Sequence, residues 1–262
     1  MSSDGKIAFS VVVPVYNESL TINTLHKRLS LVLNKLNGSY EIIFVDDGST
    51  DNSYELLKQI GCVDASVCVL SFSRNFGQHK AAIAGLLEAA GEYVITIDAD
   101  LQNPPEEIPK LVAKIREGYD MVAGIRKDRK DPFFRRLGSF FINLIIYVQT
   151  GLKMRDYGSM LRIFQNKTAK ELADAFSRTE GYITMLVAKV THDVAEVVVE
   201  HDERSFGKSK YNLRKLVKLI AKIVFCYHEG FFRFCGGRVQ KPLFVISKRI
   251  KYGKETFLTS QY

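Results

Sequence analysis

Several features that would assign a chain to a class at first sight are absent from this sequence. Its 262 residues include four cysteines, and these form no CxxC pair and no spacing typical of metal ligands. Neither a GxxxxGK[ST] phosphate loop nor a GxGxxG fingerprint occurs, which disfavours a P-loop kinase and a dinucleotide oxidoreductase. The first residues do not resemble a signal peptide. We therefore expect a cytoplasmic protein with reduced thiols.

Apolar runs long enough to cross a membrane are also absent. The two most apolar helix candidates, residues 133–148 and 213–225, are interrupted by polar and basic residues and fall short of the roughly 18 apolar residues that a span needs. Basic amphipathic helices with a rich apolar face suit the plane of a membrane surface. The alternative is that both are ordinary core helices.

The charge is unevenly distributed along the chain. The composition, 46% hydrophobic and 25% charged, is that of a globular protein and excludes a disordered chain. The net charge is +8, but the residues from His201 to the end carry 14 lysines and arginines against four acidic residues, a net +10. A basic terminal segment can contact nucleic acid, anionic lipid or an acidic partner, or can simply be a solvated face.

Strand and helix patterns alternate through the first half of the chain. Strands are predicted at residues 9–14, 40–45, 67–72, 93–97 and 120–123, and helices at residues 20–36, 52–60, 80–90 and 106–117. This alternation predicts an α/β fold with a mostly parallel, Rossmann-like sheet. The regularity weakens after residue 125, and residues 236–262 receive no predicted role.

Polar residues follow four of the predicted strands. In parallel α/β sheets ligands bind at the carboxyl ends of the strands, so these residues are expected to form one rim. The four segments are Pro14-Val-Tyr-Asn-Glu18, Asp46-Asp-Gly-Ser-Thr-Asp51, Ser73-Arg-Asn-Phe-Gly-Gln-His79 and Asp98-Ala-Asp-Leu-Gln102.

The acidic pair Asp98 and Asp100 closes the fourth of these strands. Carboxylate oxygens suit Mg²⁺ or Mn²⁺, ions that usually complete their coordination shell with substrate phosphates. The pair therefore favours a nucleotide-diphosphate site, against the alternative of a polar turn. Asp46 and Asp47 are available to a ribose or a base, whereas Asp51 is expected to cap the next helix. His79 fits a donor contact or a structural role equally well.

These segments together resemble glycosyltransferase family 2. The resemblance spans residues 7–228 and is closest to its polyprenyl-phosphate glycosyltransferases, the group that contains dolichol-phosphate mannosyltransferase and bacterial undecaprenyl-phosphate 4-deoxy-4-formamido-L-arabinose transferase. The motifs that carry it are Val13-Pro-Val-Tyr-Asn-Glu18, Val45-Asp-Asp-Gly-Ser-Thr-Asp51, Asp98-Ala-Asp-Leu-Gln-Asn-Pro-Pro105, Asp156-Tyr-Gly-Ser-Met-Leu-Arg162 and Arg204-Ser-Phe-Gly-Lys-Ser-Lys-Tyr211. It implies the GT-A fold and a metal-dependent, inverting transfer of a sugar from a nucleotide-diphosphate sugar, with UDP as the expected nucleotide, to undecaprenyl or another polyprenyl phosphate.

The resemblance also implies roles for individual residues. Asp98 and Asp100 would engage Mg²⁺ or Mn²⁺ and the diphosphate. The donor would contact Pro14, Tyr16, Glu18, Asp46 and Gln102. The acceptor phosphate would be held by Arg126, Arg135, Ser139, Arg204 and Lys210.

The catalytic residues implied by the resemblance are Asp100, Asp156 and Arg126. Two roles are possible for Asp156. It resembles the residue proposed as the base in relatives. However, a phosphate acceptor is already a nucleophile and needs little help from a base. An orienting role, in which Asp156 binds an acceptor-site arginine, therefore stays equally open.

Two domains are expected: a catalytic domain at residues 1–211 and a basic, membrane-proximal helix and tail at residues 212–262. Relatives with these motifs commonly continue into two membrane-spanning helices, whereas this sequence departs from them after Tyr227. We therefore expect peripheral attachment to an anionic membrane surface, at the cytoplasmic face of the inner or plasma membrane, and leave open a homo-oligomer. A soluble sugar or glycan acceptor is the alternative enzyme function. A nucleic-acid-binding module is disfavoured because it leaves the acidic strand ends unexplained.

Overall fold

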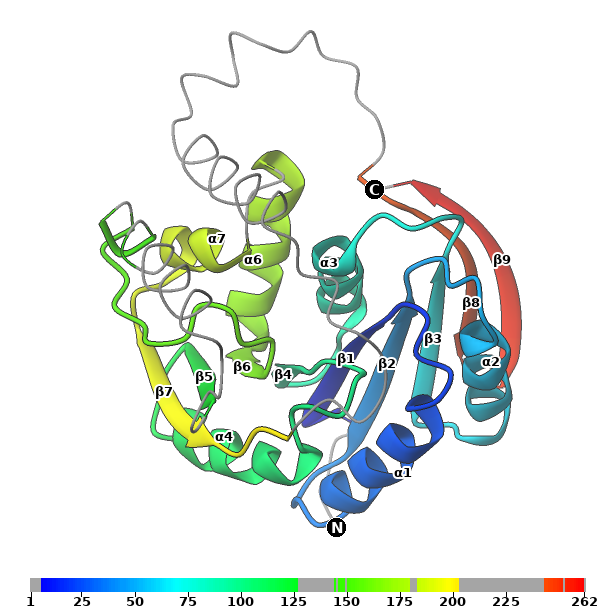
Figure 1. The fold of residues 1–262 in the computed structure, drawn as a ribbon, viewed down its shortest axis with the longest axis horizontal. Helices are drawn as coiled ribbons and strands as arrows, with labels where there is room; N and C mark the ends of the chain where they lie inside the picture. The colour runs from blue at the N-terminus through cyan, green and yellow to red at the C-terminus, as the bar shows by residue number, and fades with distance from the viewer. Residues whose placement is uncertain are drawn as a thin grey trace, which may run out of the picture.

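A nine-stranded mixed sheet with helices on both faces forms the centre of the molecule (Figure 1). The computed structural model describes residues 6–126, 144, 146–148, 150–179, 183–202, 243–251 and 253–261. The strands are β1 (Phe9–Val15), β2 (Tyr40–Asp46), β3 (Val67–Phe72), β4 (Tyr93–Thr96), β5 (Met121–Arg126), β6 (Arg162–Gln165), β7 (Val194–Val199), β8 (Val245–Lys251) and β9 (Lys254–Gln261). The helices are α1 (Ile22–Leu33), α2 (Ser53–Val63), α3 (Gln78–Glu88), α4 (Ile108–Ile115), α6 (Asn166–Thr179) and α7 (Ile183–Val190), with a 3₁₀ turn at Pro105–Glu107.

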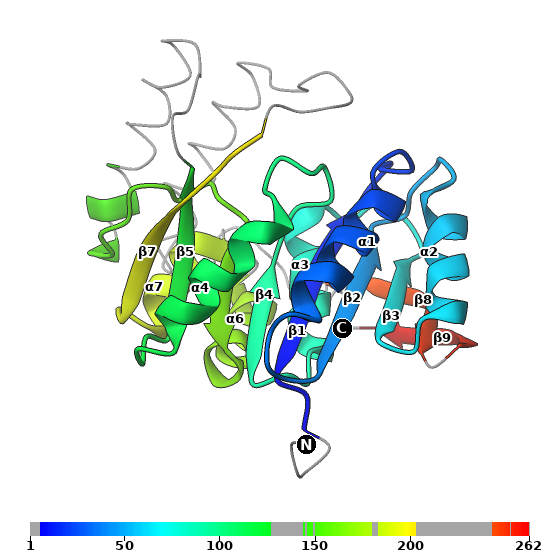
Figure 2. The same cartoon turned by 90° about the horizontal axis from the view of Figure 1, so that it is seen from below.

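The strand order is β7-β5-β6-β4-β1-β2-β3-β8-β9 (Figure 1). Figure 2 shows β7 and β5 on one side of β4, and β1, β2 and β3 on the other. The strands β1 to β4 pair in parallel, as do β5 and β7, whereas β6 runs antiparallel to both β4 and β5. The predicted α/β class with a mostly parallel sheet is confirmed. The antiparallel β6, like α6, α7 and β7, lies in the part of the chain where the sequence pattern was weak.

Alternation along the strands divides the core into two layers. Val11 and Val13 of β1 pack with α1, α2 and α4, and Val12 packs with α3, α6 and α7 on the opposite face. Both faces of the parallel strands are therefore buried, which explains why these strands are continuous apolar runs. Gly85 lets α3 approach β1 closely, because a Cβ at this position would lie 2.2 Å from Val12 Cγ1.

The C-terminal hairpin of β8 and β9 extends the sheet beyond β3. β8 pairs antiparallel with β3, and β9 pairs antiparallel with β8. This hairpin was not predicted from the sequence, in which its residues belong to the expected tail at residues 212–262. Basic and polar residues are interspersed with apolar ones along the hairpin, which hides the pattern of a buried strand. Ile246 and Ile250 of β8 are buried only because the strand pairs with the sheet.

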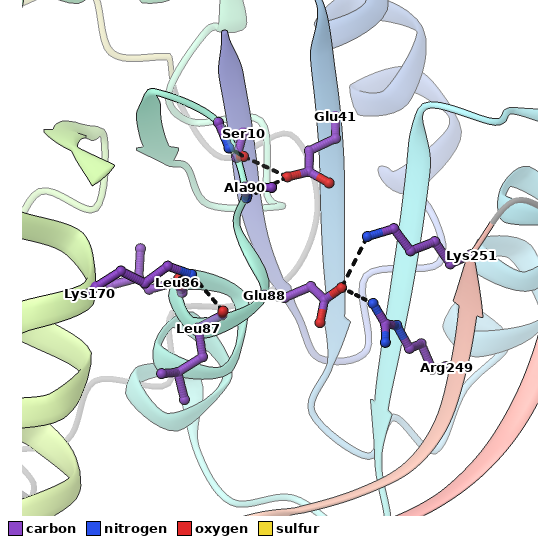
Figure 3. Close-up of polar contacts among 10 residues, drawn as sticks. Ser10, Glu41, Leu86, Leu87, Glu88, Ala90, Lys170, Arg249 and Lys251 are labelled. Atoms are coloured by element: carbon purple, nitrogen blue, oxygen red, sulfur yellow. Dashed lines mark hydrogen bonds and ion pairs between the residues drawn. The ribbon is translucent and has the colours of Figure 1, made fainter. Parts of the chain in front are cut away.

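The end of α3 is fixed by charged side chains from two other elements (Figure 3). Glu88 accepts hydrogen bonds from Arg249 and, at 3.3 Å, from Lys251, both on β8. From α6, Lys170 Nζ donates to the backbone oxygens of Leu86 and Leu87 at 2.9 and 2.6 Å. The two contacts from Lys170 satisfy carbonyl groups that the end of a helix leaves without partners.

Candidate active site at the carboxyl ends of the strands

The loop after β1 is joined to the loop after β2 by Asn17. Its side-chain oxygen accepts hydrogen bonds from the backbone N–H groups of Thr50 and Asp51, at 2.8 and 3.3 Å. The backbone of Asn17 is left-handed, with φ at 56°. This turn places Tyr16, which is 38% exposed, and Glu18 at the rim, as the sequence predicted. Pro14 lies below them as a buried residue of β1.

Asp46 ends β2 as a buried residue whose carboxylate is held from two sides. It accepts a hydrogen bond from the N–H of Ser49 at 3.1 Å and another from the hydroxyl of Ser71 at 2.9 Å. The side chain is 2% exposed. Its predicted contact with the nucleoside stays a prediction. Asp51, predicted to cap a helix, accepts the N–H of Ser53 at 2.9 Å, although Asn52 occupies the N-cap position of α2.

Asp47 is buried and bound to the loop between β3 and α3. Its carboxylate accepts hydrogen bonds from the Asn75 side chain at 2.9 Å, from Phe76 N–H at 2.7 Å and from Gly77 N–H at 2.9 Å. Burial raises the pKa of Asp47 above its ordinary value in spite of these hydrogen bonds. Asp47 was predicted to be available to a ribose or a base, but its carboxylate is hydrogen-bonded to the loop between β3 and α3.

Asp98 and Asp100 lie in the turn that follows β4. Gln78, the first residue of α3, donates a hydrogen bond from its side-chain amide to Asp98 Oδ1. The Asn103 amide approaches Asp98 Oδ2 at 3.4 Å, and Asp100 accepts the N–H of Gln102 at 3.2 Å. Gln78 belongs to a segment predicted to lie at the rim, but no role was predicted for it from the sequence. His79, the next residue, is half-buried in the first turn of α3.

Charges from three strand ends act on Asp98. Burial, and after it the neighbouring charge of Asp100, raise the pKa of Asp98 to about 7. The charge of Glu18 adds to this effect, whereas the Gln78 hydrogen bond and the charge of Arg126 oppose it. The predicted residues from the ends of β1, β4 and β5 therefore share one electrostatic environment.

Arg126, the last residue of β5, forms a bidentate ion pair with Asp156. Nε lies 2.6 Å from Asp156 Oδ2, and Nη2 lies 2.9 Å from Oδ1. The Asp156 side chain is 4% exposed and also accepts the N–H of Gly158 at 3.1 Å. A Cβ on Gly158 would lie 3.2 Å from Arg126 Nη2. The geometry agrees with the orienting role that the sequence left open for Asp156.

The segment that leaves β7 returns to the acidic pair. Asp202 N–H donates to the backbone oxygen of Gln102 at 2.9 Å, and Glu200 N–H donates to the Glu107 carboxylate at 3.2 Å. Gln102 is therefore at the rim beside Asp100, as predicted. The remaining acceptor-phosphate candidates, Arg135, Ser139, Arg204 and Lys210, lie outside the described residues, as does the helix candidate at residues 213–225.

The sequence profile described as "Glycosyl transferase family 2" matches residues 10–177. This chain belongs to glycosyltransferase family 2. Two curated relatives are named undecaprenyl-phosphate 4-deoxy-4-formamido-L-arabinose transferase. The one from Yersinia enterocolitica is 42% identical over 86% of this chain and 69% of its own length. The one from Edwardsiella ictaluri is 44% identical over 83% of this chain and 67% of its own length.

Solved structures give the fold of this family 2 glycosyltransferase. Glucosyl-3-phosphoglycerate synthase from Mycobacterium tuberculosis, in complex with Mn²⁺ and UDP-glucose, has a TM-score of 0.59 and is 18% identical. The similarity covers 84% of this chain and 79% of that one. At this identity the likeness establishes the GT-A fold alone, and it confirms the predicted fold class.

The acidic pair of this glycosyltransferase fits a divalent cation. Among the described residues, no group of three or more histidine, cysteine, aspartate or glutamate side chains is arranged to hold a metal ion. The two carboxylates of Asp98 and Asp100 suit an ion that takes its other ligands from diphosphate and water, as Mg²⁺ and Mn²⁺ do. A cation at this point would also favour the ionised form of Asp98, which burial and Asp100 disfavour.

Proposed function

We propose that this glycosyltransferase moves a sugar from a UDP-sugar to a polyprenyl phosphate, with inversion at the sugar C1 and with Mg²⁺ or Mn²⁺ as the cofactor. The observation that carries the proposal is the convergence on one rim of an acidic pair, suited to a metal diphosphate, and an oriented arginine, suited to a phosphate. The names of the relatives, which are 42–44% identical, support a polyprenyl-phosphate acceptor.

The donor would bind across the ends of β1, β2 and β4. Tyr16 and Glu18 lie at the rim and would contact the nucleoside, together with the buried Asp46 at the end of β2. Asp98 and Asp100 would hold the cation and the diphosphate, with Gln102 beside them. When bound, the cation neutralises the charge that builds on the departing nucleotide diphosphate.

Arg126 would bind the acceptor phosphate in this proposal. A guanidinium has five N–H donors and can bind a carboxylate through one edge while it engages a phosphate through another. Asp156 fixes the orientation of Arg126 through two hydrogen bonds. Arg135, Ser139, Arg204 and Lys210 are expected to complete the phosphate site.

The reaction needs positioning more than it needs a base. A phosphate oxygen forms the new bond to C1, the bond from C1 to the nucleotide diphosphate breaks, and its electron pair leaves with the diphosphate. A phosphomonoester carries about −1.5 to −2 charges near neutral pH, so no proton has to be removed from the attacking oxygen. We therefore assign Asp156 to orientation of Arg126.

We further propose that the enzyme attaches peripherally to the cytoplasmic face of the membrane that carries its acceptor. Within the described part of the chain, no helix combines the length and the apolar character needed to cross a bilayer. The described end of the predicted helix at residues 133–148 is helical, and it exposes Leu144, Tyr147 and Val148 by 45%, 47% and 73%. Adjacent exposed apolar side chains of this kind suit contact with a lipid interface.

The experiment is a measurement of nucleotide diphosphate release. UDP- and GDP-sugars are supplied with Mg²⁺ or Mn²⁺, in the presence and absence of a polyprenyl phosphate. We expect release that requires the lipid, the metal and a UDP-sugar, and the productive donor identifies the sugar. Release that depends on a soluble sugar or glycan acceptor instead would overturn the proposed acceptor class.

A further inference from the structure

Gln78 joins helix α3 to the acidic pair. Its side chain leaves the first turn of α3 and donates a hydrogen bond to Asp98 Oδ1, while Asn103 approaches Oδ2 from the other side at 3.4 Å. Asp98 is thus held between two amide groups that come from different segments.

The residues before Gln78 are fixed by a single buried carboxylate. Asp47, 2% exposed, accepts hydrogen bonds from Asn75, Phe76 and Gly77, the three residues that lead into α3. The distances of 2.7 to 2.9 Å are those of strong, charge-assisted hydrogen bonds. The backbone position from which the Gln78 side chain starts is therefore determined by Asp47.

Two glycines make this arrangement possible. Gly48 has φ at +65°, and a Cβ on it would lie 2.4 Å from the backbone carbon of Arg74, so the loop after β2 packs directly on the loop after β3. Gly77 has φ at +101°, a conformation that other residues rarely adopt. A side chain larger than that of glycine at position 48 or 77 would strain the loop that contains it.

We infer that Gln78 is a positioning residue for Asp98, and that Asp47 acts on the acidic pair through Gln78. The inference rests on the proposed function in one respect, namely that Asp98 and Asp100 hold the cation. A carboxylate ligand that rotates loses its alignment with the ion, and side chains that hydrogen-bond to metal ligands commonly control affinity for this reason. Asp47 is then needed for the geometry of the metal site without touching donor or metal.

Binding of Mn²⁺ tests the role of Gln78 without turnover. We would titrate the full-length chain with Mn²⁺ alone, with Mn²⁺ and UDP, and with Mn²⁺ and GDP, and follow free Mn²⁺ by electron paramagnetic resonance. Gln78→Met keeps the length of the side chain and removes the N–H donor. We expect it to weaken Mn²⁺ binding by about 10-fold or more. Gln59→Met, the same change at an exposed position of α2, is the matched control and should bind as the native chain does.

The outcomes separate the inference from the proposed function. Unchanged Mn²⁺ affinity in Gln78→Met would overturn the positioning role, whatever the acceptor proves to be. A native chain that binds no Mn²⁺ in any of the three titrations would overturn both. In turnover assays, we expect the Mn²⁺ concentration for half-maximal rate to rise by the same factor, with a smaller change in the rate at saturating Mn²⁺. A fall in that rate with unchanged metal dependence would assign Gln78 a different role.

A double variant tests whether Asp47 acts through Gln78. Asp47→Asn removes the charge and turns an amide N–H₂ toward groups that themselves donate, so the loop loses its fixed position. If the inference holds, the double variant Asp47→Asn/Gln78→Met binds Mn²⁺ about as tightly as whichever single variant binds it more weakly. If the losses of Mn²⁺ affinity in the two single variants multiply in the double variant, Asp47 does not act through Gln78. If Asp47→Asn does not fold, the Gln78→Met titration still decides the positioning role.

Discussion

At the scale of residues, the chemistry of the site depends on which polar groups hold each charged side chain. Asp98 is held by amides from α3 and from its own turn, whereas Arg126 is held by the buried carboxylate of Asp156. A charged group fixed in this way acts on a substrate without first having to be ordered, which lowers the free-energy cost of reaching the transition state.

Asp100→Asn tests the metal site directly. Because the substitution removes one of two carboxylates suited to the cation, we expect turnover supported by Mg²⁺ or Mn²⁺ to fall by about 100-fold or more. The measurement is kcat/KM over a range of metal concentrations. Asp174→Asn, at an exposed position on α6, is the control. Native activity in Asp100→Asn would remove Asp100 from the metal site.

Asp156→Asn distinguishes orientation from base catalysis. With its ion pair weakened, Arg126 loses its fixed direction, so we expect the KM for the lipid phosphate to rise by about 10-fold while kcat keeps its dependence on pH. Arg126→Lys, which cannot form the bidentate pair, should give the same pattern. A large loss of kcat that removes a pH-dependent step, with KM unchanged, would instead identify Asp156 as a base.

At the scale of elements, α3 connects the acidic pair to the C-terminal hairpin. Its first residue, Gln78, contacts Asp98. Its last residue, Glu88, is bound by Arg249 and Lys251 (Figure 3). The hairpin therefore supports a helix whose opposite end lies in the site. This relation was invisible in the sequence because residues 88 and 249 are far apart along the chain.

Glu88→Gln is expected to loosen the hairpin. The carboxylate is 19% exposed and faces two cations that would lose their counter-charge. We expect the free energy of unfolding to fall by about 1–3 kcal/mol, as for a hydrogen-bonded charge that is partly buried. Urea denaturation measures the change, with Glu55→Gln on the exposed surface of α2 as the control. Equal stability in the two variants would show that the hairpin is held by its strand pairing alone.

Asp64 couples α1 and α2 in a way that depends on pH. Burial raises the pKa of Asp64, but hydrogen bonds from Ser66 and from His26, 2.8 Å away on α1, outweigh burial, so the pKa lies below the ordinary value. An acid whose pKa is lowered by folding contributes stability above its unfolded pKa, about 3.9, and this contribution is lost as the pH falls through the folded value.

The corresponding prediction concerns Asp64→Asn. Relative to the native chain, we expect a loss of about 1–2 kcal/mol in the free energy of unfolding at pH 6 to 7. The difference should begin to shrink below about pH 4, where the unfolded carboxylate takes up a proton, and it should vanish once the folded carboxylate is protonated too. Urea denaturation at a series of pH values provides the measurement. A difference independent of pH would show that the charge of Asp64 is not what stabilises this contact.

At the scale of the whole molecule, charge and exposed apolar residues both favour a lipid surface. The net charge is +8, and the residues from His201 onward carry +10, which is more than the whole of this excess. Leu144, Tyr147 and Val148 add exposed apolar area close to the acceptor residues in sequence. An anionic bilayer, which is the proposed location of the acceptor, would satisfy both features.

Flotation with liposomes tests this attachment. We expect binding to vesicles that contain anionic lipid, and weaker binding as the salt concentration rises, because salt screens the attraction. Replacing Leu144 and Val148 by glutamine should reduce binding, while replacing the exposed Leu31 on α1 should not. No binding to anionic vesicles at physiological salt would overturn peripheral attachment.

The sequence by itself determined the parallel half of the fold and the positions of the polar strand ends. A strand that is apolar along its whole length, such as residues 9–15, must be buried on both faces of the sheet. The positions of the strands, and of the rim at their ends, could therefore be predicted from the local sequence pattern. The same reasoning identified Asp98 and Asp100, because carboxylates that follow a buried strand must lie at its end. Such features depend on neighbours along the chain.

Only the tertiary structure decided which side chains meet. The pairing of Arg126 with Asp156, the contact of Gln78 with Asp98 and the addition of β8 to β3 join residues 20 to about 180 positions apart. No local periodicity encodes such pairs. They exist because folding buries charged groups that must then find partners, and which partner lies within reach is set by the packing of the sheet and its helices.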